Sequence, residues 1–230
     1  MSTQKINAVV FDVVGTLVDS QGTILKELES VFFNNQVKSE TVNDFKKKWG
    51  KEQDIIFEAI LTGKRPYIIE DDVRRQSLQT TLEKEEITLS SEDFERLATV
   101  GTRYSPWEKV PEQLAKLCQR VKTIGLTNSG MAQIVEVAAQ GKLQWHTLLS
   151  AQLVSSYKPD PKVYQFAIEL LALTPKQTLF VSTHPWDLRA AFKAGFQTAY
   201  LPRKYVEGPK DTDHFDYYFD SLDDLIELFE

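Results

Sequence analysis

A short, uninterrupted apolar run at residues 8–11 (AVVF) is the feature that most constrains how this 230-residue chain can fold. Continuous β-branched runs of this length are typical of strands buried on both faces, as in a parallel sheet covered by helices. The run ends at Asp12, and Gly15 follows, so we expect a sharp turn there. The sequence therefore predicts a buried first strand with a carboxylate at its end.

After Pro106 the sequence alternates between strand-like and helix-like segments. Short strands are predicted near residues 123–126, 148–150, 178–181 and 198–201, with helical segments between them and a short strand and a helix closing the chain. Repeated β–α units imply parallel strands joined by right-handed crossovers. We therefore expect an α/β fold: a Rossmann-like, doubly wound parallel-sheet core formed by residues 1–18 and 104–230.

Residues 19–103 have a different pattern, in which amphipathic segments repeat at helical period and no convincing strand occurs. Several of these segments begin after Ser, Thr or Asp, residues that favour helix N-termini. The sequence therefore predicts an all-helical domain of three or four helices inserted into the α/β core.

The charge balance excludes some partners. The chain carries 27 Lys and Arg against 33 Asp and Glu, a formal net charge of −6, which leaves no electrostatic footprint for nucleic acid but permits a local pocket for a small anionic substrate. No stretch approaches the roughly 18 apolar residues that span a membrane, and the N-terminal apolar run is too short for a signal peptide. The single cysteine, Cys118, excludes an intramolecular disulfide. We expect a cytoplasmic protein that binds neither nucleic acid nor membrane.

Polar residues gather directly after four of the predicted strands. They lie at residues 12–16, 127–129 and 157–159, and at 182–184 with Asp187. In an open α/β sheet, ligands bind outside the carboxyl ends of the strands. The sequence therefore predicts that these four clusters meet in one site.

These clusters, in this order, resemble those of the haloacid dehalogenase superfamily. The matching segments are FDVVGTLVDS, GLTNSG, YKPDPKVY and FVSTHPWDLRAA. The resemblance covers the whole core, about 145 residues, and the helical stretch at 19–103 resembles the cap domain of that family. It implies a hydrolase whose nucleophile is the carboxylate of Asp12.

The residue at position 14 indicates which branch of the superfamily the sequence resembles most. Most members of the superfamily are phosphatases with a second aspartate two residues after the nucleophile, where this chain has Val14. Type II 2-haloacid dehalogenases also lack that aspartate, and they share a tyrosine six residues after the lysine, here Tyr164, and a tryptophan before the last aspartate, here Trp186. A positioned general acid contributes about 10²–10⁴ in rate to the departure of an alkoxide, whereas halide leaves without a proton. The sequence therefore favours attack by Asp12 on C2 of a 2-haloacid, giving an ester that water cleaves to the 2-hydroxy acid.

The resemblance implies a role for each catalytic candidate. Asp12 is the expected nucleophile, and the hydroxyl of Thr16 is expected to hold its carboxylate in one rotamer. Lys158 is expected to keep Asp12 ionised and to neutralise the crowded carboxylates. Asp187 is expected to orient or activate the water, and Ser182 to hold substrate or water.

Further residues are expected to contact the substrate. Thr127 and Asn128 are expected either to bind its anionic group, assisted by backbone N–H groups, or to cap the following helix. Val14 is expected to line the site, and Tyr164 either to contact substrate or to pack in the core. His184 stands where many dehalogenases carry asparagine, and a neutral imidazole can donate or accept a hydrogen bond there.

The predicted cap departs from the dehalogenase pattern at one position. Dehalogenases hold the leaving halide with an arginine close after a tryptophan, but here Trp49 is followed by Gly50. A lysine in that role would lack the planar fork of a guanidinium. Four nearby cations are candidates to substitute: Lys48, Lys51, Arg74 and Arg75.

Three functions remain open from the sequence. The first is a dehalogenase that needs no cofactor. The second is a phosphatase that binds Mg²⁺ through Asp12, Asp187 and the backbone carbonyl of Val14, which survives any change of side chain. The third is a catalytically weak member that binds a ligand or partner. The oligomeric state is also open. A homodimer is possible, but no apolar stripe in the sequence indicates one.

Overall fold

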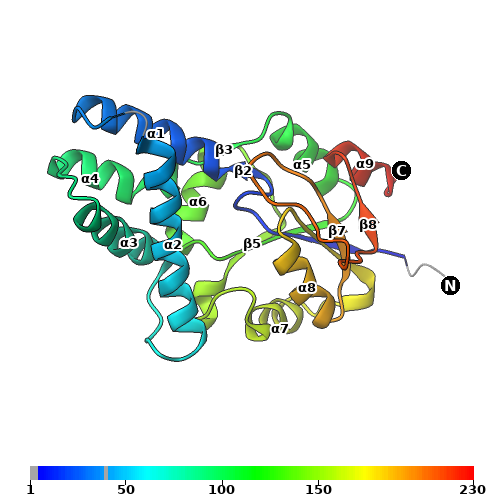
Figure 1. The fold of residues 1–230 in the computed structure, drawn as a ribbon. Coiled ribbons are helices and arrows are strands. Elements are labelled where there is room, and N and C mark those ends of the chain that lie inside the picture. The colour runs from blue at the N-terminus through cyan, green and yellow to red at the C-terminus, as the bar shows by residue number, and fades with distance from the viewer. Residues whose placement is uncertain (1–4, 39–40) are drawn as a thin grey trace. The chain divides into compact units, whose positions relative to one another are not determined.

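The structure, a computed structural model, describes residues 5–38 and 41–230. It forms two compact units, one of Met1–Asp19 with Pro106–Glu230 and one of Ser20–Ser105. The chain passes between them through two-residue strands, β2 (Val18–Asp19) and β3 (Ser105–Pro106). Figure 1 labels many of the helices and strands of both units.

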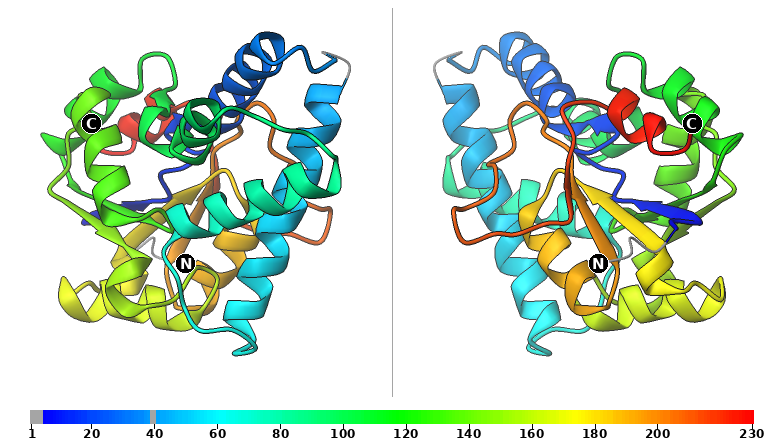
Figure 2. Two further views of the ribbon diagram at one scale, coloured as in Figure 1. Left: turned by 90° about the vertical axis from the view of Figure 1, so that its left-hand side faces the viewer. Right: turned by 90° about the vertical axis from the view of Figure 1, so that its right-hand side faces the viewer.

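The first unit is built on a six-stranded sheet in the order β5-β4-β1-β6-β7-β8, with every neighbouring pair parallel. β1 lies inside the sheet (Figure 2), where Val10 is paired with Ile124 on one side and Phe180 on the other. The strands are β1 (Ala8–Phe11), β4 (Lys122–Thr127), β5 (Thr147–Ser150), β6 (Thr178–Ser182), β7 (Gln197–Tyr200) and β8 (Tyr217–Tyr218). The predicted α/β fold with a doubly wound parallel sheet is confirmed.

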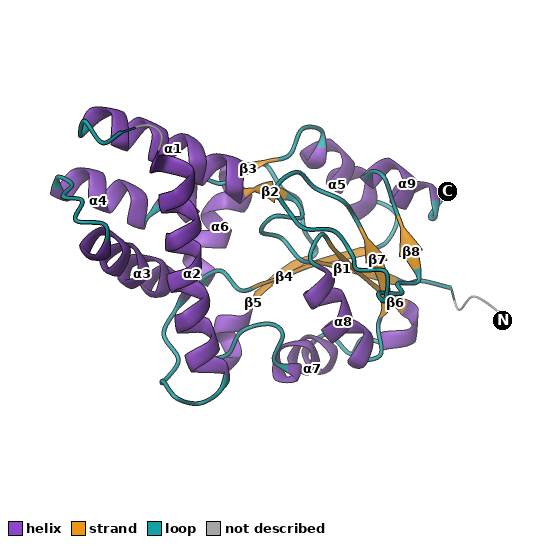
Figure 3. Cartoon of the chain, viewed as in Figure 1, coloured by secondary structure: helices purple, strands orange, loops and turns teal. Residues whose placement is uncertain are grey.

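Helices cover both faces of this sheet. Figure 3 shows α5 and α9 on one side and α7 and α8 on the other. The helices are α5 (Val110–Cys118), α6 (Met131–Gln140), α7 (Pro161–Leu170), α8 (Pro185–Lys193) and α9 (Leu222–Glu227), with short 3-10 turns at Ala151–Val154 and Pro175–Gln177. Because both faces are covered, every residue of β1 and β6 is buried. This explains why β1 and the middle of β6 are continuous apolar runs rather than alternating ones.

Aromatic packing fixes the helices on the sheet. The ring of Phe180, on β6, lies with its centroid 5.7 Å from that of Tyr164 on α7 and 5.7 Å from that of Phe196. All three side chains are at most 2% exposed. Tyr164 therefore does pack in the core, one of its two predicted roles.

The second unit is all helical, with α1 (Ser20–Asn34), α2 (Val42–Leu61), α3 (Glu70–Lys84), α4 (Ser91–Ala98) and a 3-10 turn at Val100–Arg103. Its core centres on Trp49, whose ring packs against Phe45 and whose indole N–H donates to the hydroxyl of Ser77 at 2.9 Å. No helix of the described residues is long and apolar enough to cross a membrane.

We predict that Phe196→Ala destabilises the sheet unit by about 3–5 kcal/mol, because it removes a fully buried ring between helix and sheet. Phe192→Ala is the matched control, since that ring is 59% exposed and surface changes usually stay within about 0.5 kcal/mol. Urea unfolding followed by circular dichroism measures both. Equal losses in the two variants would contradict this account of the core.

Candidate active site

Three neighbouring strands of the sheet end in polar residues. Asp12 follows β1, Thr127 ends β4 and Ser182 ends β6. Because these strands are parallel neighbours, their carboxyl ends meet at one edge of the sheet. The carboxylate, the turn after it and two later loops therefore converge there, as the sequence predicts.

A buried ammonium group joins two carboxylates at the centre of this site. Lys158 Nζ lies 2.8 Å from Asp12 Oδ1 and 2.6 Å from Asp187 Oδ2, and the three side chains are 1%, 6% and 0% exposed. Burial alone lowers the pKa of Lys158, but the charges of Asp12 and Asp187 outweigh it, so the pKa lies above its ordinary value. Lys158 therefore stays charged at neutral pH. Burial raises the pKa of Asp187, and the nearby lysine opposes only part of that rise.

The second oxygen of Asp12 is held by the turn that follows β1. Thr16 Oγ1 donates to Asp12 Oδ2 at 2.6 Å and accepts from the backbone N–H of Thr183 at 3.0 Å. Because Thr183 N–H occupies a lone pair of the hydroxyl, the single proton of Thr16 is directed at Asp12. Both carboxylate oxygens of Asp12 thus have a fixed donor.

Asp187 is equally constrained. It lies in the first turn of α8, where the helix dipole favours a carboxylate. Tyr164 donates its hydroxyl to Asp187 Oδ1, and Ser182 Oγ lies 3.5 Å from Asp187 Oδ2. Burial and the adjacent Asp187 raise the pKa of Tyr164, so the phenol stays protonated and remains a donor. Tyr164 is positioned because α7 begins at Pro161, with Asp160 as its N-cap.

Asn128 has a contact that the sequence did not predict. Its side-chain oxygen accepts from Lys158 N at 2.7 Å and its nitrogen donates to Lys158 O at 3.2 Å. The amide nitrogen carries two protons and this contact uses one, so the side chain holds the backbone of Lys158 while its contact with an anion stays a prediction. Thr127 Oγ1 accepts from Ser129 N at 3.2 Å, a local turn contact.

His184 lies against the turn after β1. Its Nε2 is 3.1 Å from the carbonyl oxygen of Val14 and 3.7 Å from Asp12 Oδ2. A carbonyl only accepts, so this contact requires the proton on Nε2. A Cβ on Gly15 would lie 2.8 Å from Nε2, and the φ of Gly15 is +89°. Glycine is therefore required at this position by both the backbone and the imidazole.

The helical unit pairs most of the cations proposed as halide ligands. Lys48 Nζ lies 2.7 Å from Asp44 and 2.6 Å from Glu85. Arg74 is buried and bonded to Glu70, and Arg75 is bonded to Glu95. These three candidates are therefore neutralised within their own unit, whereas Lys51 is exposed.

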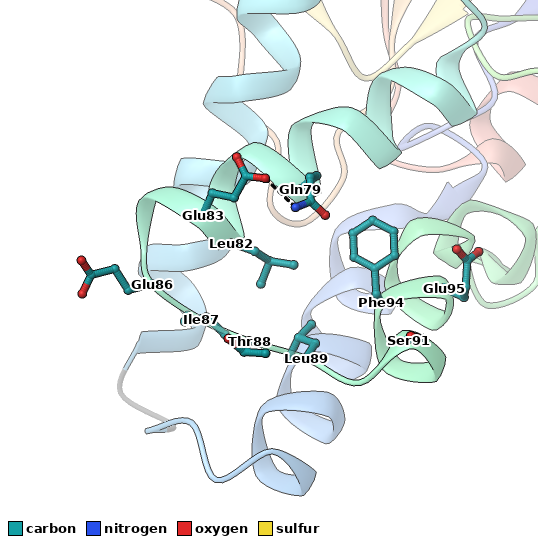
Figure 4. A pocket seen from close by; sticks show the side chains of 10 residues that line it. All are labelled: Gln79, Leu82, Glu83, Glu86, Ile87, Thr88, Leu89, Ser91, Phe94 and Glu95. Carbon is teal, nitrogen blue, oxygen red and sulfur yellow. Dashed lines mark hydrogen bonds between the residues drawn. The ribbon is translucent and has the colours of Figure 1, made fainter.

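A surface pocket of about 660 Å³ in the helical unit does not suit an anionic substrate. It lies between α3 and α4 (Figure 4), and Glu83, Glu86 and Glu95 rim it. Glu83 accepts a hydrogen bond from Gln79 at 2.6 Å. The described lining of this pocket contains no Lys or Arg, whereas the cluster around Asp12 includes the ammonium group of Lys158, so that cluster is the better candidate site for an anion.

Comparison with known proteins agrees with this geometry. The sequence model of the haloacid dehalogenase-like hydrolases matches residues 6–195. The chain belongs to this family. It is therefore a hydrolase. It is 26% identical over 213 residues to the (S)-2-haloacid dehalogenase 4A of Burkholderia cepacia, covering 87% of this chain and 84% of that protein.

Two further proteins show the range of similarity. The crystal structure of the L-2-haloacid dehalogenase PA0810 superposes with a TM-score of 0.87 at 27% identity, covering 96% of this chain and 97% of that one. The pyrophosphatase PpaX of Bacillus mycoides is 25% identical over 241 residues, covering 97% of each chain.

Trp107 and Arg203 hold the turn after β1. The sequence did not predict a role for either residue. Trp107 Nε1 donates to the carbonyl oxygen of Gly15 at 2.9 Å, and Arg203 Nε donates to that of Thr16 at 2.7 Å. Neither residue belongs to the four polar clusters. No local pattern in the sequence indicates these contacts, because the partners are about 90 and 190 residues apart.

We predict that Lys158→Met lowers the free energy of unfolding by about 3–5 kcal/mol at pH 7, because two buried carboxylates lose their cation. The loss should shrink as the pH falls towards 5. The pKa of Asp187, already raised by burial, rises further without Lys158, so its protonation relieves the repulsion. Urea unfolding from pH 5 to 8 measures this. The control is Lys162→Met, which removes an exposed lysine. A loss of free energy of unfolding that does not change with pH would contradict the prediction.

Proposed function

We propose that this hydrolase is a 2-haloacid dehalogenase that works through an ester on Asp12. The observation that carries the proposal is the pairing of a buried carboxylate held by Lys158 and Thr16 with an aliphatic Val14 in the general-acid position. Such a site can attack carbon but cannot protonate an alkoxide from position 14. A halide leaving group needs no proton, so the chemistry that suits this site is displacement of halide.

In the first step an oxygen of Asp12 attacks C2 of the substrate. The O–C2 bond forms as the C2–halogen bond breaks, and the halide leaves with the bonding electrons. Lys158 and Thr16 hold the carboxylate in one orientation, which lowers the entropic cost of the attack. The loop between Thr127 and α6 would receive the substrate carboxylate through backbone N–H groups other than those of Ser129 and Met131, which donate to Thr127 Oγ1 and Gln152 Oε1.

In the second step water attacks Cγ of the Asp12 ester. Asp187 accepts the proton of the water, and its raised pKa makes it a stronger base than an ordinary carboxylate. Lys158 stabilises the negative charge that develops on the ester oxygen. The acyl C–O bond then breaks, the leaving alkoxide takes up the proton, and the 2-hydroxy acid departs. We assign Ser182 and His184 to holding the water and the substrate near Asp12.

We further propose that the helical unit serves as the cap that selects the substrate. Its support is the family resemblance and the closed, self-contained core around Trp49. Since Arg74 and Arg75 are paired within that unit, the halide contact in this chain would differ from a free cap arginine.

The magnesium phosphatase alternative does not fit the arrangement around Asp12. The three atoms that would bind the ion already have N–H partners: Lys158 lies between Asp12 and Asp187, and His184 donates to the carbonyl of Val14. Magnesium demands near-ideal octahedral geometry with oxygens at about 2.0–2.1 Å. A buried ammonium within hydrogen-bonding distance of both carboxylates competes with it for the same oxygens. We derive no step through a metal.

We predict that the purified protein releases chloride from L-2-chloropropionate, with the same rate in the presence of EDTA. The variant Asp12→Asn should lower this rate at least about 10³-fold, because an amide cannot act as the nucleophile. Chloride release and acid formation measure both. Magnesium-dependent phosphate release from a panel of phosphate esters, without chloride release, would support the phosphatase instead. If the protein releases neither chloride nor phosphate, the remaining hypothesis is a catalytically weak member of the family that binds a ligand or partner.

We predict that the oxygen of the product comes from Asp12 in the first turnover. In H₂¹⁸O, with enzyme in excess, the 2-hydroxy acid should contain no ¹⁸O. The peptide that carries Asp12 should gain about 2 Da, since water enters at Cγ. Mass spectrometry of both species measures this. Label in the product of the first turnover would mean that water attacks C2 directly, and would rule out the ester.

A further inference from the structure

The turn between β1 and β2 presents two consecutive carbonyl groups, and both are bound by side chains from distant parts of the chain. Trp107 donates to Gly15 O and Arg203 to Thr16 O, at 2.9 and 2.7 Å. The guanidinium also lies over the Trp107 ring, with its carbon 5.8 Å from the ring centroid. The two side chains therefore form one clamp on the backbone of the turn.

The guanidinium of Arg203 is charged but lies in a largely buried environment. Burial lowers the pKa of Arg203 to about 10, so the group remains charged at neutral pH. Its Nη2 atom is buried without a hydrogen-bond partner, and within residues 5–38 and 41–230 the structure contains no ion pair between Arg203 and a carboxylate. Burying a charge without a counter-ion costs free energy. The residue is therefore poorly explained by stability alone.

Thr16 connects this clamp to the nucleophile. Its carbonyl oxygen accepts from Arg203, while its hydroxyl, on the same residue, donates to Asp12 Oδ2 at 2.6 Å and accepts from Thr183 N. Thr16 is fully buried, so a shift of its backbone moves the hydroxyl away from the carboxylate. A misplacement of about 1 Å at a reacting group can cost about 10²-fold in rate.

We propose that Arg203 is a positioning residue for Asp12 that acts through Thr16. It fixes the carbonyl of Thr16 so that the hydroxyl of the same residue keeps the carboxylate in its attacking orientation. This inference deepens the proposed function and rests on Asp12 as the nucleophile. It adds a residue outside the four polar clusters to the machinery of the reaction.

A double-mutant cycle tests this coupling. Arg203→Met should lower kcat for L-2-chloropropionate by about 10- to 100-fold with KM changed less than about 3-fold. In a Thr16→Val background the same change should alter kcat less than about 2-fold, because no hydroxyl remains to be positioned. Arg203→Lys keeps the charge and a donor but places the donor one bond farther out. Its loss should be smaller, about 3- to 10-fold, and should also vanish in the Thr16→Val background.

The matched control is Arg189→Met, which removes an arginine of the same unit whose ion pair, among the described residues, is with the carboxylate of Asp213. It should leave kcat unchanged. Thermal unfolding of each variant separates stability from rate, since any loss of stability from Arg203→Met should persist in the Thr16→Val background. Equal losses of kcat in both backgrounds, or a loss of stability with kcat unchanged, would overturn the proposal.

A measurement without substrate separates this inference from the proposed reaction. In protein labelled with ¹³C at the aspartate carboxyl carbons, Asp12→Asn identifies the resonance of Asp12. Arg203→Met should shift that resonance in the same direction as Thr16→Val, and Arg189→Met should not. If the wild type releases no halide but these shifts occur, the positioning role stands and the dehalogenase proposal fails. An unchanged Asp12 resonance in Arg203→Met would refute the positioning role whatever the substrate.

Discussion

The ammonium group of Lys158, buried between Asp12 and Asp187, is the interaction on which the rest of the site depends. Two carboxylates this close to each other in a dry environment repel strongly, and an unpaired buried charge is costly. With the lysine between them, each carboxylate has a cation within hydrogen-bonding distance. The surrounding contacts keep this arrangement in place, since Asn128 fixes the backbone of Lys158 and Tyr164 fixes the far oxygen of Asp187.

The α/β sheet makes this arrangement possible because it brings the three groups together at one edge. Asp12 leaves β1 between the ends of β4 and β6, and Asp187 enters on the first turn of α8 after β6. Lys158 arrives on the loop before α7, and its position is set by the helix start at Pro161 and by Asn128 after β4. A change in the pairing of β1 with its neighbours would therefore separate the charges, which ties the stability of the sheet to the chemistry at its edge.

The fold class could be predicted from the sequence because buried parallel strands and amphipathic helices leave local patterns, as residues 8–11 show. The residues around Asp12 were also named in advance, because each follows a strand and carries a polar side chain. What the sequence does not contain is which atoms pair. Asn128, expected at an anion, also holds the backbone of Lys158, and Arg203 binds the turn after β1 although it belongs to none of the four polar clusters. Such contacts join residues far apart in the chain, so only the packed structure determines them.

Charge counting connects the unpaired guanidinium to the substrate class. With both carboxylates ionised, Asp12, Asp187 and Lys158 together carry one formal negative charge, which opposes the approach of the anionic substrate that we propose. Arg203 brings one positive charge to the backbone of Thr16, the residue whose hydroxyl contacts Asp12, and no carboxylate among the described residues neutralises it by an ion pair. The charge of Arg203 thereby balances the formal charge around the turn. A second cation directly on Asp12 would instead weaken its carboxylate as a nucleophile.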